Sequence, residues 1–186
     1  MFVPMLAAAI LSAWMASARP TFAIVLGQLR VARLSAADWR LALSVLAFSA
    51  SAVALLQFLN IAIWPGLAPH PPFMKVEPLA AEQYYILGLW LPFFFANILG
   101  EELWWRGFIQ PRQERVFGRT TWIVQGLLHG VFHVSFGLGV LFVLWPVLFA
   151  IPWAVQRSRN TSVGIVIHAG INAAGFLAVT LGLLPV

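Results

Sequence analysis

Residues 84–110 read YYILGLWLPFFFANILGEELWWRGFIQ, and this stretch decides the fold. The run is long enough and apolar enough for a transmembrane helix, which needs about 20 apolar residues. Two adjacent acidic residues, Glu101 and Glu102, interrupt it, and Arg106 is the only other charged residue in the stretch. An ionised carboxylate inside a bilayer costs about 2.5–3.5 kcal/mol on insertion scales. The acidic pair therefore predicts a functional site.

The composition predicts an integral membrane protein. Of 186 residues, 61% are hydrophobic and 9% are charged, and the mean hydropathy is +0.89. Soluble domains contain about 25% charged residues. The length predicts a single domain over residues 1–186. The absence of cysteine excludes disulfides, thiolate metal sites and cysteine nucleophiles. The net charge of +5 does not indicate a nucleic-acid partner, because the basic residues are scattered singly at segment ends, where they orient membrane proteins.

The hydrophobic pattern predicts an all-α, polytopic membrane helix bundle, since every backbone polar group in lipid needs a partner within the protein. Six stretches are candidate spans, over residues 2–18, 41–64, 84–105, 120–136, 138–155 and 162–185. The first lacks the charged residues that precede the apolar core of a signal peptide, so we interpret it as a span. The fourth and fifth are short and are predicted to form a helical hairpin.

The basic residues predict the orientation. Nine arginines fall in three alternate loops: Arg19, Arg30, Arg33, Arg40, Arg112, Arg115, Arg119, Arg157 and Arg159. The opposite loops contain one basic residue, Lys75. This bias places the arginine-rich loops in the cytoplasm and both termini outside, most simply in the cell membrane. Within segment 19–40, Ser35 and Asp38 have the spacing of a capping box, and we expect an interfacial amphipathic helix there.

Few titratable groups lie within the spans, and they occur at helical spacing. Glu102 and Arg106 are four residues apart and can pair on one helix face. Glu101 points about 100° away from Glu102, so it can face a cavity. Two further pairs have the same four-residue spacing: His129 with His133, and His168 with Asn172. Three helices thus each present a polar stripe, as a site in a bundle core requires.

These groups suit hydrolysis. A buried carboxylate can act as general base on a water molecule, and a histidine opposite can share that water or protonate the leaving amine. Amide and imidazole N–H groups of Asn172 and His168 can stabilise an oxyanion, a role worth about 2.7–4 kcal/mol in studied enzymes. Each feature also has a structural interpretation: an ion pair for Glu102 and Arg106, a packing residue for one histidine, and contact between helices for Asn172.

A metal site is an alternative. HGVFH places two imidazoles on one helix face at a spacing that suits Zn²⁺, but it lacks the glutamate of the H-E-x-x-H motif. Glu101, His133 and His168 from three helices form a candidate ligand set. The pattern leaves hydrolysis with zinc and hydrolysis without metal both open.

The same residues resemble a known family. GEELWWRGF contains E-E-x-x-x-R, His133 ends a motif of the form [F/W]-x-x-x-H, and HAGIN fits H-x-x-x-[N/D]. In order and spacing, residues 84–180 resemble the CPBP (ABI) intramembrane proteases, which include the type II CAAX prenyl endopeptidases and are often called metalloendopeptidases. The resemblance implies that Glu101 and His133 activate water. It also implies an oxyanion site at His168 and Asn172.

The chain departs from the family pattern at one position. His129 stands where the second motif has its aromatic residue, and it can orient a catalytic group, bind a metal or simply be tolerated. An alternative register with His129 as the motif histidine would put Gln125 at the aromatic position. The depths of Glu101 and His133 match if the helix of residues 84–105 continues past Arg106, or if the span of residues 120–136 begins outside the hydrocarbon. We expect both, with the first of these helices continuing toward Gln110 before Pro111.

The favoured function is an intramembrane endopeptidase that acts near the cytoplasmic face on a membrane-embedded or lipidated peptide. A non-catalytic immunity or chaperone-like membrane protein on the same scaffold is the alternative. A proton or metal carrier is a third class, but transporters often show repeated halves and this sequence shows none.

Overall fold

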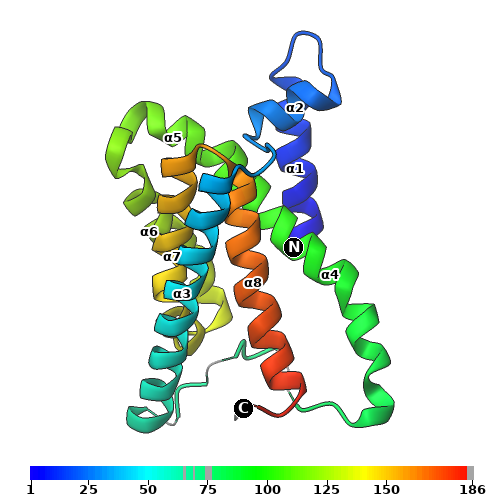
Figure 1. Ribbon diagram of the computed structural model, residues 1–186, viewed down its shortest axis with the longest axis vertical. Helices are drawn as coiled ribbons and strands as arrows, with labels where there is room; N and C mark the ends of the chain where they lie inside the picture. Colours follow the sequence, from blue (N-terminus) through cyan, green and yellow to red (C-terminus); the bar gives the residue numbers. More distant parts are fainter. Residues whose placement is uncertain (65, 69, 74–76, 184–186) are drawn as a thin grey trace.

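The regular elements of the protein are helices (Figure 1). The structure is a computed structural model that describes residues 1–64, 66–68, 70–73 and 77–183. Short 3₁₀ turns occur at Ala81–Gln83, Gly118–Thr120 and Val134–Phe136. The longer elements are α1 (Phe2–Met15), α2 (Phe22–Gln28), α3 (Ala36–Ile63), α4 (Tyr85–Glu101), the π-helix η2 (Glu102–Ile109), α5 (Gln110–Phe117), α6 (Thr121–His133), α7 (Leu138–Ser158) and α8 (Thr161–Thr180). The predicted all-α membrane bundle is confirmed.

Helix lengths agree with most of the predicted spans. Four helical stretches are long and apolar enough to cross a membrane: Ala36–Ile63, Tyr85–Phe136, Leu138–Ser158 and Thr161–Thr180. The second contains two predicted spans, because α5 leads from α4 over to α6 (Figure 1). Helix α1 has 14 residues and a length of about 21 Å, less than the hydrocarbon thickness of about 30 Å. The predicted first span is therefore helical but short.

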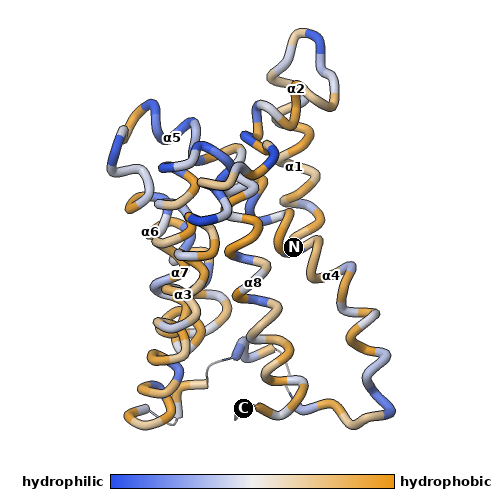
Figure 2. Tube along the Cα trace, viewed as in Figure 1, coloured by the Kyte–Doolittle hydropathy of each residue, from blue (hydrophilic) through white to orange (hydrophobic). Residues whose placement is uncertain are grey.

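The bundle is held by apolar packing between α3, α7 and α8. Their buried residues form one cluster, which contains Ala42, Val45, Val147, Ile151, Ala154, Val155, Val163, Ile167 and Ile171. Hydrophilic residues gather at the end of the bundle that carries α5 and the loops around α2 (Figure 2). The three arginine-rich loops lie at this end, which we call the basic end. Lys75, the predicted exception, lies outside the described residues.

Segment 19–40 does not form one amphipathic helix. Only Phe22–Gln28 is helical before Arg30 adopts a left-handed backbone with φ of 52°. The backbone after α2 is instead paired with the start of α8, where the Thr161 N–H donates to the Arg30 carbonyl at 2.8 Å. These tertiary hydrogen bonds replace those of a longer helix. The predicted capping box of Ser35 and Asp38 is present, but it begins the membrane helix α3.

The helical backbone that begins with α4 continues past Arg106, as predicted, through η2 and then through Pro111 of α5 to Phe117. The π-helix η2 that links α4 to α5 was not predicted. A π-helix has hydrogen bonds between residues five apart, and the Gln110 N–H donates to the Trp105 carbonyl in this way. Two carbonyls of the segment also accept from side chains: Gln125 donates to the Trp105 carbonyl at 2.6 Å, and Arg112 donates to the Phe108 carbonyl at 2.7 Å.

Two glycines allow the N-terminal helices to approach this segment closely. A Cβ atom on Gly100 would lie 2.5 Å from the carbonyl oxygen of Phe2, and one on Gly107 would lie 2.9 Å from that of Leu29. Helices α1 and α2 therefore pack directly on the backbone of α4 and η2 and fix the position of the acidic pair.

Candidate active site

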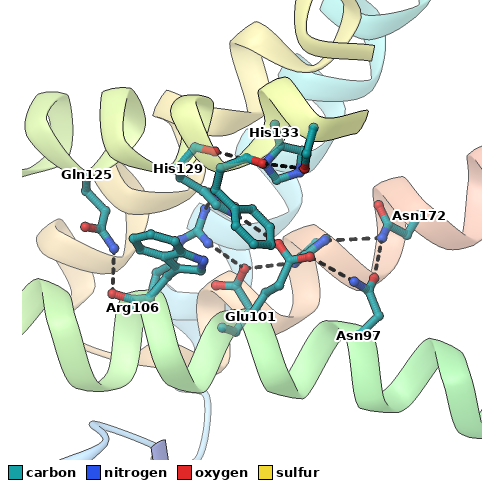
Figure 3. Close-up of polar contacts among 12 residues, drawn as sticks. Asn97, Glu101, Arg106, Gln125, His129, His133 and Asn172 are labelled. Atoms are coloured by element: carbon teal, nitrogen blue, oxygen red, sulfur yellow. Dashed lines mark hydrogen bonds and ion pairs between the residues drawn. The ribbon is translucent and has the colours of Figure 1, made fainter. Parts of the chain in front are cut away.

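The structure brings the predicted polar residues together. Glu101 ends α4, Glu102 and Arg106 lie on η2, His133 ends α6, and His168 and Asn172 lie on α8. The relative exposure of the five titratable residues is at most 8%. Residues of α4 with η2, of α6 and of α8 thus lie together at one polar site, as predicted (Figure 3).

Glu101 is held by two donors. Its Oε2 lies 2.9 Å from Nε2 of His129, and its Oε1 accepts a hydrogen bond from Nδ2 of Asn97 at 2.9 Å. Asn97 was not among the predicted site residues. It could have been identified as an amide in an otherwise apolar run, four residues before Glu101 and on the same helix face.

Glu102 contacts one residue of its own helix and one residue of α8. Its Oε1 lies 3.4 Å from Nη1 of Arg106, so the predicted ion pair is present. The same oxygen lies 2.9 Å from Nδ1 of His168. Glu102 therefore connects η2 with α8, a contact that helical spacing alone does not reveal. Its Oε2 faces Gly164, where a Cβ atom would lie at 2.5 Å.

The contacts of His129 define its protonation. Nη2 of Arg106 lies 3.0 Å from Nδ1 of His129, and a guanidinium can only donate. Nδ1 must therefore accept, and the ring proton lies on Nε2, where it is donated to the Glu101 carboxylate. Of the roles left open for His129, the geometry favours orientation of Glu101.

His133 keeps one ring nitrogen available. Its Nδ1 donates to the backbone carbonyl of His129 at 2.9 Å, so Nε2 is the unprotonated nitrogen. Nothing in the described part of the chain hydrogen-bonds this Nε2. One ligand-type atom each of Glu101, His129 and His133 lies within 4.8 Å of the others. His133 thus places a free base beside a buried carboxylate.

Asn172 closes a ring of polar contacts. Its Nδ2 donates to Oδ1 of Asn97 at 2.9 Å and lies 3.2 Å from Nε2 of His168. Because His168 donates from Nδ1 to Glu102, its Nε2 accepts from Asn172. We call the closed chain the polar ring; its members in order are Glu101, Asn97, Asn172, His168, Glu102, Arg106 and His129.

The candidate metal ligands differ from the predicted set. Among described residues, Glu101, His129 and His133 lie close enough to share an ion, whereas His168 is committed to Glu102 and Asn172. A metal on Nε2 of His129 would move that ring proton to Nδ1, against the N–H of Arg106 at 3.0 Å. The tautomer that Arg106 imposes therefore does not fit a three-ligand metal site.

A comparison with family models finds a match over residues 83–174 to the family described as type II CAAX prenyl endopeptidase Rce1-like. These bounds include every member of the polar ring and His133. The comparison with curated proteins and the comparison with solved structures each found no match.

Proposed function

Because this chain belongs to the Rce1-like family of type II CAAX prenyl endopeptidases, we propose that it is an intramembrane endopeptidase that hydrolyses a membrane-associated peptide. The observation that carries the proposal is the placement of a free His133 imidazole within 4.8 Å of the Glu101 carboxylate, with the amide of Asn172 joined to that carboxylate through Asn97. Peptide hydrolysis needs a base for water and a donor for the oxyanion, and this arrangement contains both.

In the proposed reaction, Glu101 and His133 hold one water molecule. Glu101 already accepts from His129 and Asn97, but a carboxylate has about four acceptor positions and can still accept from water. As the water oxygen bonds to the scissile carbonyl carbon, its proton moves to Glu101. The C–N bond then breaks and the proton is delivered to the leaving amine. His129 keeps the carboxylate oriented throughout.

The oxyanion is assigned to Asn172. In the resting arrangement the ring N–H of His168 points to Glu102, so His168 does not offer a proton to substrate. Nδ2 of Asn172 lies 3.2 Å from Nε2 of His168, which is a long hydrogen bond. The N–H that makes this bond can donate to the developing oxyanion instead. His168 then acts as a positioning residue that is itself held by Glu102. Arg106 completes the support by balancing the charge of Glu102.

The substrate we propose is a membrane-embedded or lipidated peptide. The site lies among helices whose outer surfaces carry large exposed apolar side chains, so a substrate reaches it most readily from the bilayer. The basic end of the bundle corresponds to the cytoplasmic side if the arginine bias sets the orientation.

Cleavage of model peptides tests the function. Protein reconstituted in liposomes is expected to cleave farnesylated and unmodified transmembrane peptides at defined bonds, as measured by mass spectrometry. Because His129 does not fit a metal, treatment with 1,10-phenanthroline should leave at least about half of the activity. Loss of activity that Zn²⁺ restores would contradict the metal-free mechanism, and no cleavage of any membrane peptide would contradict the enzyme.

Gly164→Ala tests the support of Glu102. The new Cβ would lie 2.5 Å from Glu102 Oε2 and would displace this carboxylate from His168 and Arg106. We expect kcat to fall about 100-fold, as misplacements of about 1 Å can do. Gly175→Ala on the same helix is the matched control, because nothing lies within 4 Å of its Cβ position. Equal activity in the two variants would contradict the role of Glu102.

A further inference from the structure

A polar cavity lies at the basic end, and none of its lining residues belongs to the polar ring. Its volume is about 690 Å³, within the range of ligand pockets, which is about 300–1,000 Å³. It is formed where the end of α2, helix α5 and the turn between α7 and α8 meet. The charged residues that line it are Arg30, Arg112, Glu114, Arg115 and Arg159.

The cavity carries an excess of positive charge. Arg30 and Glu114 form a two-point ion pair, with N–O distances of 2.9 and 2.7 Å, which neutralises one arginine. Arg112 stacks over the Phe108 ring at 3.5 Å and, within the described part of the chain, has no carboxylate partner. Among described residues, Arg115 and Arg159 also lack a carboxylate within ion-pair distance. Three arginines of the cavity lining, Arg112, Arg115 and Arg159, thus have no carboxylate at ion-pair distance among the described residues.

Phosphate is the anion that this arrangement fits. A guanidinium donates through a planar fork that matches phosphate oxygens, and several arginines around one cavity can share a single phosphate. Arg30 and Arg159, which both line the cavity, each have a left-handed backbone, with φ of 52° and 54°. The wall is also tied to α8, because Thr161 donates to the carbonyls of Leu29 and Arg30.

The surroundings of the cavity favour a lipid over free phosphate. The helices that line it also expose large apolar side chains: Phe22 at the start of α2 is 76% exposed, and Val116, which follows Arg115 on α5, is 76% exposed. Apolar side chains beside arginines at the end of a bundle are typical of contact with the headgroup region. Basic pockets between membrane helices bind anionic headgroups. We propose that this cavity binds the phosphate group of an anionic phospholipid.

Lipid binding by charge-matched variants tests the proposal independently of the proposed peptidase activity. Native mass spectrometry of the detergent-purified full chain would measure the Kd for phosphatidylglycerol and for phosphatidylcholine. The wild type should prefer phosphatidylglycerol, and Arg115→Ala with Arg159→Ala should weaken its binding about tenfold or more. Arg119→Ala with Arg157→Ala removes the same charge from the same end but not from the cavity lining, and it should change the Kd less than about twofold.

Three results would overturn the proposal. Equal affinity for the two lipids would remove the anionic preference, and equal weakening in both double variants would assign the binding to general surface charge. Displacement of phosphatidylglycerol by inorganic phosphate at about 1 mM would assign the cavity to free phosphate. Thermal unfolding of each variant in the same detergent checks that the fold is intact. All four arginines are exposed, so we expect the variants to fold.

Discussion

Replacing Glu101 by glutamine is expected to lower kcat for peptide cleavage by about 10³-fold or more. Glutamine keeps the size of the side chain but cannot take a proton from water. General-base contributions are about 10²–10⁴-fold, and Glu101 also places the water. His129 and Asn97 each donate a hydrogen bond to one oxygen of the Glu101 carboxylate. The NH₂ group of a glutamine would replace one of these oxygens and would face a donor. The measurement is single-turnover cleavage of a membrane peptide in liposomes.

A matched change at an exposed glutamate serves as the control. Glu82→Gln alters a carboxylate in the turn before α4, away from the polar ring, and should retain full activity. Full activity in Glu101→Gln would contradict hydrolysis at this carboxylate. If the wild type cleaves nothing and Glu101→Gln retains a measurable immunity function, the non-catalytic alternative is favoured.

Replacing His133 by alanine is expected to lower kcat by about 10²–10³-fold, because it removes the available imidazole beside Glu101. His129→Ala should have a smaller effect of about tenfold, the loss expected for one hydrogen bond to a charged group. The ratio of the two effects distinguishes the motif registers. A larger loss at His129 than at His133 would assign the water-activating role to His129.

His70→Ala provides the matched control for both histidine variants. His70 lies in the loop between α3 and α4, and its Nδ1 lies 3.2 Å from the carbonyl oxygen of the neighbouring Pro71. Its replacement should leave kcat unchanged. The melting temperature of each variant in detergent separates a loss of chemistry from a loss of folding.

Much of the fold could be predicted because hydrophobic length dominates membrane proteins. The runs that contain α3, α7 and α8 were each identified from their apolar length, and their ends differ from the predicted ones by a few residues. The backbone of segment 19–40 was not predictable from its own residues. Its hydrogen-bond partners, Asn160 and Thr161, lie more than 120 positions away in the chain. Local periodicity contains no information about such pairs.

The contacts of the site that could be predicted are those between residues four apart on one helix. Glu102 with Arg106 and His168 with Asn172 contact each other as that spacing indicates. Contacts between residues of different helices could not be predicted in this way. The link from Glu102 to His168 depends on the close approach that Gly164 permits. The π-helix also could not be foreseen, since α-helical spacing gives no sign of an added residue in a turn.

A double-mutant cycle tests whether Glu101 and His133 act on the same water molecule. Single-turnover rates would be measured for the wild type, Glu101→Gln, His133→Ala and the double variant, with isotope-labelled peptide to detect slow cleavage. Residues that act as a unit give strongly non-additive losses. The account predicts that the double variant is within about threefold of the slower single variant. A double variant whose loss equals the product of the two single losses would contradict it.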